Sequence, residues 1–145
     1  MAGAMDEILT YIDSYSTALV IGTNAFAGYL PETTGRAVAV FETGGLPPVH
    51  TYAGSLPVIE RPRVQIIARS TRPTAGAPAS ATGVHAIIDT VWRLLDGIAN
   101  RSLSGTTYLR VAAVQRPFLM EIDGRGRQIW VFNADCSRRK TTSNL

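Results

Sequence analysis

Apolar residues recur along this chain with two different spacings, and the spacing predicts which element each segment forms. From Val84 onward they follow the three- and four-residue spacing of an amphipathic helix, with polar residues mostly on the opposite side. The positions on this apolar stripe are Val84, Ile87, Ile88, Val91, Leu94, Leu95 and Ile98. Burial of such side chains stabilises a fold by about 1.5–3 kcal/mol each, so we expect this helix to be a core element.

A second helix is predicted near the N-terminus, where Asp6 can act as its capping residue. Its apolar stripe consists of Ile8, Leu9, Ile12, Tyr15 and Leu19. Gly22 suits the left-handed conformation that often ends a helix, and residues 23–35 are expected to form a loop.

Strands are predicted where apolar and polar residues alternate between proline and glycine residues. The first is Ala37–Glu42, which Gly44 and Gly45 end, and Leu46–Pro48 then imposes an extended or turning path. A short strand is expected near Val49–Tyr52. The segment Arg63–Arg69 alternates clearly. Its buried face consists of Val64, Ile66 and Ala68, and its partly wet face of Arg63, Gln65, Ile67 and Arg69.

The C-terminal third contains the remaining predicted strands. Tyr108–Val114 ends near Pro117, Phe118–Ile122 follows, and Asp123–Gly126 is a good hairpin turn because both of its glycines can take a positive φ. Arg127–Asp135 is apolar on both faces, so we expect it to be an inner strand, covered on both sides by a helix or a partner subunit.

The elements together predict an α+β fold, a single mixed sheet of four or five strands with two helices packed on it. A length of 145 residues suits one domain over residues 1–145, in which residues 136–145 form a frayed C-terminal tail. No internal repeat and no long linker divides the chain.

Composition narrows the class of protein. Apolar residues make up 46% of the chain and charged residues 17%, which indicates a folded protein. No apolar run approaches the ~18 residues of a membrane span, and the first residues lack the pattern of a signal peptide. The single cysteine, Cys136, excludes an internal disulfide. We therefore expect a protein made and used in a cytoplasm, with no membrane partner.

The net charge of +3 hides an asymmetry between the two parts of the chain. Residues 1–60 hold six acids and one base, a sum of −5, whereas residues 61–145 hold thirteen bases and five acids, a sum of +8. In a monomer this is an ordinary solvated surface. In a ring, the acidic part of one subunit would face the basic part of the next.

Candidate catalytic or metal-binding chemistry is sparse. His50, His85 and Cys136 include no pair with metal-ligand spacing, and surface or packed histidines are the more ordinary explanation. Cys136 lacks a positioned base, and Glu121 and Asp123 sit beside a hairpin turn rather than in a cleft. We expect no enzyme activity, no cofactor and no metal.

A small basic nucleic-acid-binding module is the alternative from another class, since the isoelectric point is near 9.4. The only dense basic run is Arg138–Lys140. Three phosphate contacts would change affinity only about 40-fold between roughly 50 and 200 mM salt. No aromatic residues are interleaved with these bases for stacking, so a solvated tail is the more ordinary explanation.

The order and spacing of several segments resemble the minor capsid and tail-completion family of phages, the tail terminators of long non-contractile tails. The resembling segments are Val40–Pro48, Glu60–Arg69, Ala86–Val91, Gly105–Tyr108, Pro117, Asp123–Arg127 and Val131–Asn133. Together they span roughly two thirds of the chain.

The resemblance implies a non-enzymatic virion protein, assembled in the host cytoplasm. Such terminators form a hexameric ring that caps the tail tube, ends its polymerisation and joins the tail to the head connector, while DNA passes through the ring. The implied partners are copies of the chain, the tail-tube protein, the head-connector or neck protein and, non-specifically, the genomic DNA. Another neck protein, for head completion or as a stopper, is the nearest alternative.

Two hypotheses about surfaces follow. Arg63 and Arg69, on the wet strand face, and Arg125 and Arg127, at the hairpin, are expected to pair with acids across a subunit or partner interface. The polar loops Pro31–Gly35 and Gly44–Pro48 are expected to carry specificity for the tube or the connector.

Overall fold

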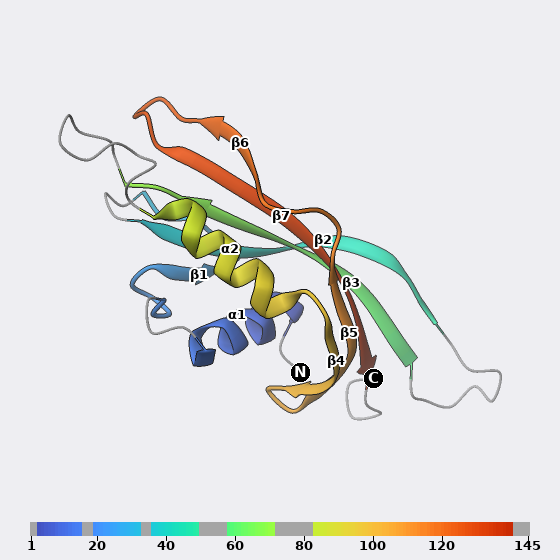
Figure 1. Ribbon diagram of the computed structural model, residues 1–145. Helices are drawn as coiled ribbons and strands as arrows, with labels where there is room; N and C mark the ends of the chain where they lie inside the picture. The colour runs from blue at the N-terminus through green and yellow to red at the C-terminus, as the bar shows by residue number, and fades with distance from the viewer. Residues whose placement is uncertain (1–2, 16–18, 33–35, 50–57, 72–82, 141–145) are drawn as a thin grey trace.

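A single curled sheet with two helices on one side forms the molecule (Figure 1). The computed structural model describes residues 3–15, 19–32, 36–49, 58–71 and 83–140. Its elements are α1 (Ala4–Tyr15), β1 (Ala25–Ala27), β2 (Ala37–Val49), β3 (Val58–Arg69), α2 (Val84–Leu95), β4 (Ile98–Leu103), β5 (Thr106–Ala113), β6 (Phe118–Ile122) and β7 (Gln128–Lys140). The α+β prediction is confirmed, but the prediction of four or five strands is wrong, because the described residues form a sheet of seven.

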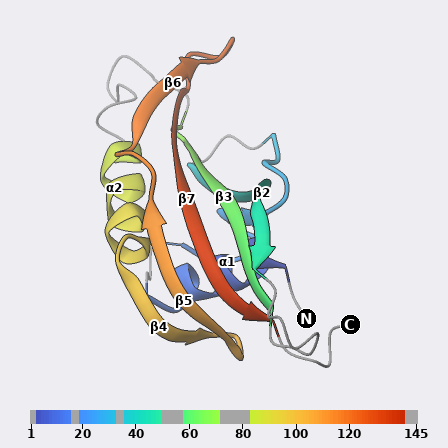
Figure 2. The ribbon, with the colours of Figure 1, turned by 90° about the vertical axis from the view of Figure 1, so that its right-hand side faces the viewer.

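The sheet is mixed and has the order β1-β2-β3-β7-β5-β4, with β6 also paired to β7. Among the strands of the described residues, β1 and β2 run parallel, and the other pairs are antiparallel. β5 and β6 lie one after the other along the same side of β7, since Ala113 pairs with Ala134 and Phe118 with Val131. The inner position predicted for the strand after Arg127 is therefore confirmed: β3 flanks β7 on one side, and β5 and β6 on the other (Figure 2).

The core lies between the helices and the concave face of the sheet. The predicted inward residues of β3, Val64, Ile66 and Ala68, are fully buried. From α2 they meet Val84, Ile88, Val91 and Leu95, all buried, which confirms the predicted stripe of this helix as far as Leu95. Ile98 is also buried but begins β4, because the helix ends at Leu95 and Gly97 has a φ of 92°.

Four further predictions about elements are wrong. β1 lies within the expected loop at residues 23–35, and β4 was not predicted at all. α1 ends at Tyr15, whose side chain is 60% exposed rather than part of the core stripe. The tail expected to fray from Cys136 continues β7 as far as Lys140. Residues 50–52 of another predicted strand lie outside the described residues, and its first residue, Val49, ends β2.

The glycines expected to end the first strand are part of it. β2 continues through Gly44–Pro48, in register with β3 at Gly45, opposite Pro62, and at Leu46, opposite Arg61. The register shifts between Glu42 and Gly45, which is a β-bulge. Gly45 has a φ of 129°, and a Cβ there would lie 2.2 Å from the carbonyl oxygen of Arg61. Only glycine fits at this position.

Substitution of Gly45 by alanine is expected to destabilise the paired ends of β2 and β3. Gly44→Ala is the matched control: its φ of 96° also disfavours alanine, but no atom lies within 4 Å of the added Cβ. The strained φ alone costs about 1–3 kcal/mol. Urea unfolding should show a larger loss of stability for Gly45→Ala than for Gly44→Ala. Equal losses would contradict the close approach of the Gly45 backbone to Arg61.

Membrane crossing by a helix has no support in the described part of the chain, where α1 and α2 are each 12 residues long.

Candidate functional site

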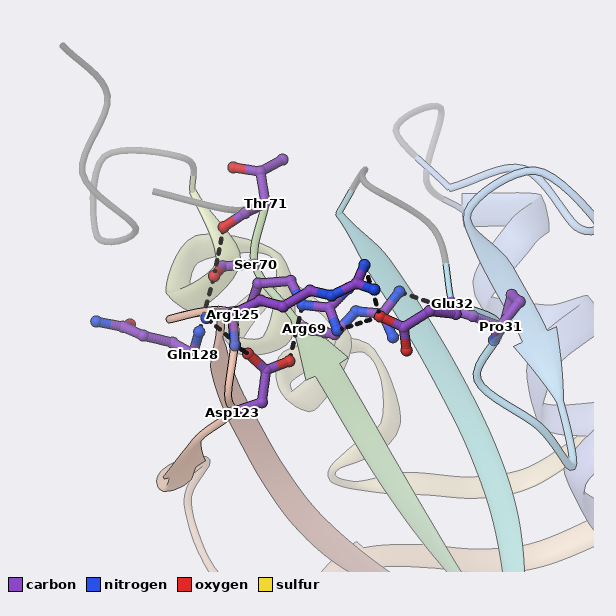
Figure 3. A network of polar contacts seen from close by, with 9 residues as sticks. Pro31, Glu32, Arg69, Ser70, Thr71, Asp123, Arg125 and Gln128 are labelled. Atoms are coloured by element: carbon purple, nitrogen blue, oxygen red, sulfur yellow. Dashed lines mark hydrogen bonds and ion pairs between the residues drawn. The ribbon is translucent and has the colours of Figure 1, made fainter. Parts of the chain in front are cut away.

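Three of the four arginines singled out by the sequence meet at one end of the sheet, where β3 ends and β7 begins (Figure 3). Arg69 is the last residue of β3, Arg125 lies in the turn between β6 and β7, and Arg127 directly precedes β7. Glu32, from the connection between β1 and β2, and Asp123, at the start of the turn, join them. We call these five residues the rim network.

Hydrogen bonds and ion pairs connect the rim network closely. Arg127 Nη2 donates to Glu32 Oε1 and Arg127 Nε to Asp123 Oδ2, both at 2.7 Å. Arg125 Nη1 lies 3.1 Å from Glu32 Oε1, and Arg69 Nη2 donates to the carbonyl oxygen of Pro31 at 2.7 Å. Two segments far apart in the sequence, Pro31–Glu32 and the β6–β7 turn, are thereby joined across the end of β3.

Burial separates the arginines of the rim network into two kinds. Arg69 and Arg127 are 3% and 4% exposed, so the prediction that Arg69 lies on a wet face is wrong. Burial lowers the pKa of Arg69, and the nearby Arg127 lowers it further. Arg125 is exposed. Three guanidinium groups face two carboxylates here, which leaves the rim network with a net positive charge.

The two carboxylates of the rim network are held in their ionised form. The hydrogen bond from Arg127 lowers the pKa of Glu32. Burial would raise the pKa of Asp123, but it is outweighed by hydrogen bonds from the backbone N–H groups of Arg127 and Arg125, at 3.0 and 2.9 Å, and the pKa is lowered. Both groups favour the folded state only when they are ionised.

This arrangement predicts a dependence of stability on pH. Because the folded pKa values are depressed, the stabilisation is present above the unfolded pKa values, at about 4, and is lost as the pH falls through the folded values. Asp123→Asn keeps an acceptor for the turn but removes the charge. In urea titrations, the free energy of unfolding of this variant should lie below that of the wild type, by the largest amount near pH 7 and by less below about pH 4. A difference in the free energy of unfolding that stays constant between these pH values would contradict the role of the charge.

Arg63 lies apart from the rim network, on the pair of strands β3 and β7. Its Nε and Nη2 donate to the two oxygens of Asp135 at 2.6 and 3.1 Å, and both side chains are roughly half exposed. The Asp135 hydrogen bond raises the pKa of Arg63. Arg63, Arg125 and Arg127 thus meet carboxylates of their own chain, and their pairing across a subunit interface stays a prediction.

A buried carboxylate, Glu7, is the main polar residue that the sequence did not reveal. It lies in the first turn of α1, is 1% exposed, and accepts hydrogen bonds from Tyr108 Oη at 2.8 Å, from Arg138 Nη1 at 2.7 Å and from the Thr106 hydroxyl. Burial, and then the hydrogen bond to Glu7, raises the pKa of Tyr108. The available signal was helical spacing, which places Glu7 on the stripe of Ala4, Ile8 and Tyr11.

The candidate nucleophile and metal ligands do not form a shared site among the described residues. Cys136 is 2% exposed, and burial raises the pKa of its thiol to about 12, which disfavours the reactive thiolate at neutral pH. His85 packs its ring 4.8 Å from the ring of Trp130, and His50 lies outside the described residues. In the described ranges no group of three metal-ligating side chains occurs.

Exposed apolar side chains are concentrated on β6. All five of its residues are exposed, including Phe118 (43%), Leu119 (42%), Met120 (46%) and Ile122 (59%). β6 pairs with β7 on one side, and within the described residues no strand pairs with its other side. An exposed apolar strand at a sheet edge is a site where another chain can bind.

A comparison with protein families gives one finding for this fold. The model of a family described as bacteriophage tail terminator protein matches residues 11–139. The matched range starts within α1, ends within β7, and contains β1 to β6 and α2 entirely. No curated protein matches the chain.

Proposed function

The chain belongs to the bacteriophage tail terminator family, and from this premise we propose that it forms a ring, of six copies, on the last ring of the tail tube. There it ends polymerisation of the tube and joins the tail to the head connector. Membership of the family implies a place in the virion tail and a structural rather than enzymatic role. We expect assembly to take place in the host cytoplasm.

The exposed apolar strand β6 is the observation that carries the ring. Four large apolar side chains in a five-residue edge strand would lose contact with water if a second chain packed on them. A closed ring needs a heterologous interface, in which two different surfaces of one subunit meet. Part of the charge asymmetry between residues 1–60 and 61–145 is used within the chain, where Glu7 and Glu60 meet Arg138 and Glu32 meets Arg127.

The basic run at the end of β7 argues against the nucleic-acid-binding alternative. Arg138, which would supply one of three phosphate contacts, is 4% exposed and bound to Glu7. Arg139 is exposed. Because the first of its three cations is already compensated inside the fold, the run should bind a phosphate backbone more weakly than three solvated bases would. We propose that DNA is a passing and non-specific neighbour.

The exposed part of β2 is proposed to contact the tube or the connector. Every residue from Glu42 to Val49 is exposed, with Leu46 at 57%. Gly44–Pro48 is strand rather than the unpaired loop expected, so its specificity would come from outward side chains such as Leu46. Of the other predicted loop, Pro31 and Glu32 are held at the rim network, and residues 33–35 lie outside the described residues.

Native mass measurement and negative-stain imaging of the protein, alone and with its tail-tube protein, test this function. The proposal predicts rings of about six copies or a terminal cap on the tubes. A protein that stays monomeric and leaves tubes uncapped would favour another neck protein, a head-completion or stopper protein. Salt-sensitive binding of the isolated protein to duplex DNA would instead favour the nucleic-acid-binding alternative.

A further inference from the structure

Two opposite edges of the sheet lie at the same level of the strands. Ala25 of β1 pairs with Val38, Val38 with Ala68, Ala68 with Trp130, and Trp130 with Leu119 of β6. A line of paired residues therefore crosses five strands, from β1 to β6. If a neighbouring copy is rotated about an axis roughly parallel to the strands, its β1 edge can lie against the β6 edge of the first copy at this level.

Each edge carries exposed apolar side chains. The β6 edge consists of Phe118, Leu119, Met120 and Ile122. The β1 edge consists of Val20 (50% exposed), Ile21 (46%) and Tyr29 (56%), which flank β1. Beside the β1 edge, a groove of about 260 Å³ runs between α1 and β1, lined among others by Leu9, Ile21 and Tyr29. An apolar side chain of a neighbour would fit such a groove.

Charges of opposite sign accompany the two edges. Residues 3–32, which include α1 and the β1 edge, contain no lysine or arginine, and the exposed Asp6 lines the groove. Residues 116–127, which contain the β6 edge, hold three arginines and two acids. Arg116 and Arg125 have side chains exposed by 73% and 56%, and they lie 3.8 and 3.1 Å from carboxylates of the same chain, those of Asp89 and Glu32. An exposed carboxylate thus lies beside the apolar surface of one edge, and exposed guanidinium groups lie beside that of the other.

Backbone hydrogen bonds determine how the edges can meet. The outward N–H of Ala25 already donates to the carbonyl oxygen of Val20, and its carbonyl accepts from the N–H of Gly22. β1 is therefore partly closed to a further strand along its own backbone. The contact must rest on side chains, with those of β6 entering the groove beside α1.

We infer that the β6 edge of one copy packs on the β1 edge and groove of the next, head to tail, and that this contact closes the proposed ring. The occupant of the β6 edge is a second copy of this chain. The closure of this contact into a ring rests on the proposed function, whereas the contact between the two edges does not. A self-pairing of two β6 strands is the competing geometry.

Cross-linking of assembled tails tests the contact directly. Cysteines are introduced at Leu119→Cys and Ile21→Cys together, and each alone as a control, and a flexible bis-maleimide is added. Both positions are exposed, and Cys136 is buried with a raised thiol pKa, so the native thiol should react slowly. The double variant should give a ladder of covalent oligomers up to the size of the ring, and each single variant should stay monomeric on a denaturing gel.

The outcomes separate this inference from the proposed function. Covalent dimers from Leu119→Cys alone would show that β6 meets β6, and the absence of any cross-link would show that neither edge lies at the contact; either result overturns the inference. Tube lengths are measured in the same samples. Uniform capped tubes without a ladder would support the proposed function and contradict the contact. A ladder together with tubes of unlimited length would support the contact and contradict the proposed function.

A mixing experiment provides a second, independent measurement. Ile122→Asp is designed to disable the β6 edge and Ile21→Asp the β1 edge, each at an exposed position. Each variant alone should fail to form rings. Mixed, they retain one intact edge each and should form one-to-one dimers of twice the 15.6 kDa mass, which stop there. Rings from either variant alone would overturn the head-to-tail contact.

Discussion

Replacement of Glu7 by glutamine is expected to destabilise the fold by about 3 kcal/mol. The carboxylate is buried and compensates the charge of Arg138, 2.7 Å away, so its removal leaves a guanidinium that water cannot reach. Breaking a buried ion pair typically costs about 3–5 kcal/mol. The lower end is expected because Glu60 Oε1 remains 3.5 Å from Arg138 Nε. Denaturant unfolding at neutral pH measures the loss.

Two variants serve as controls for this prediction. Asp6→Asn changes a neighbouring but exposed carboxylate and should alter stability by less than about 0.5 kcal/mol. Glu7→Met combined with Arg138→Met removes both charges and should recover most of the loss, since apolar side chains can replace a buried pair at little cost. A double variant no more stable than Glu7→Gln would show that the hydrogen bonds of Tyr108 and Thr106, rather than the uncompensated charge, dominate.

Replacement of Phe132 by alanine is expected to cost about 3–5 kcal/mol. Phe132 lies in the middle of β7, is fully buried, and belongs to the main core between sheet and helices. Truncation removes its buried area and leaves a cavity in the core between the sheet and the helices. Thermal unfolding and denaturant unfolding should both show the loss.

Phe118→Ala is the matched control, because it makes the same chemical change on an edge strand. Phe118 is 43% exposed, so the expected loss of monomer stability is below about 1 kcal/mol. If β6 is the docking edge, the same variant should weaken ring formation clearly. A variant as unstable as Phe132→Ala, or one that assembles like the wild type, would contradict the separate roles of these two phenylalanines.

The sequence predicted the elements whose spacing is regular and missed those whose contacts are distant. α2 and the inward face of β3 follow their periods closely, and the structure places them in the core. The sequence did not predict β4 because its four middle residues are exposed, and because Ile98 also fits the apolar stripe of the preceding helix. A strand without alternation that directly follows a helix carries little local signal.

The C-terminal tail and Glu7 were missed for one shared reason. Arg138 looks solvated in a run of three bases, and Glu7 looks solvated at the start of a helix. Each compensates the charge of the other inside the fold, although they lie 131 positions apart in the chain. Local patterns cannot reveal such a pair, because a buried charge is tolerated only with a partner that the sequence does not mark.

The candidate surface arginines show a similar limit. The sequence placed Arg125 and Arg127 correctly beside a hairpin, but the carboxylate that Arg127 binds, Glu32, lies in a segment expected to be an isolated loop. Glu32 reaches Arg127 because it leads into β2, whose first residue, Ala37, pairs with Arg69 at the end of the sheet where β3 ends and β7 begins. The resemblance to tail terminators, by contrast, followed from the order of motifs along the chain and agrees with the matched family.

The length distribution of tail tubes, assembled with increasing amounts of this protein and imaged by electron microscopy, tests the central claim most directly. If the protein is the terminator, the tubes should stop growing once it is bound, carry a cap at one end, and keep a narrow length distribution when more tube protein is added. Tubes that continue to grow past bound protein, or that never bind it, would contradict the claim.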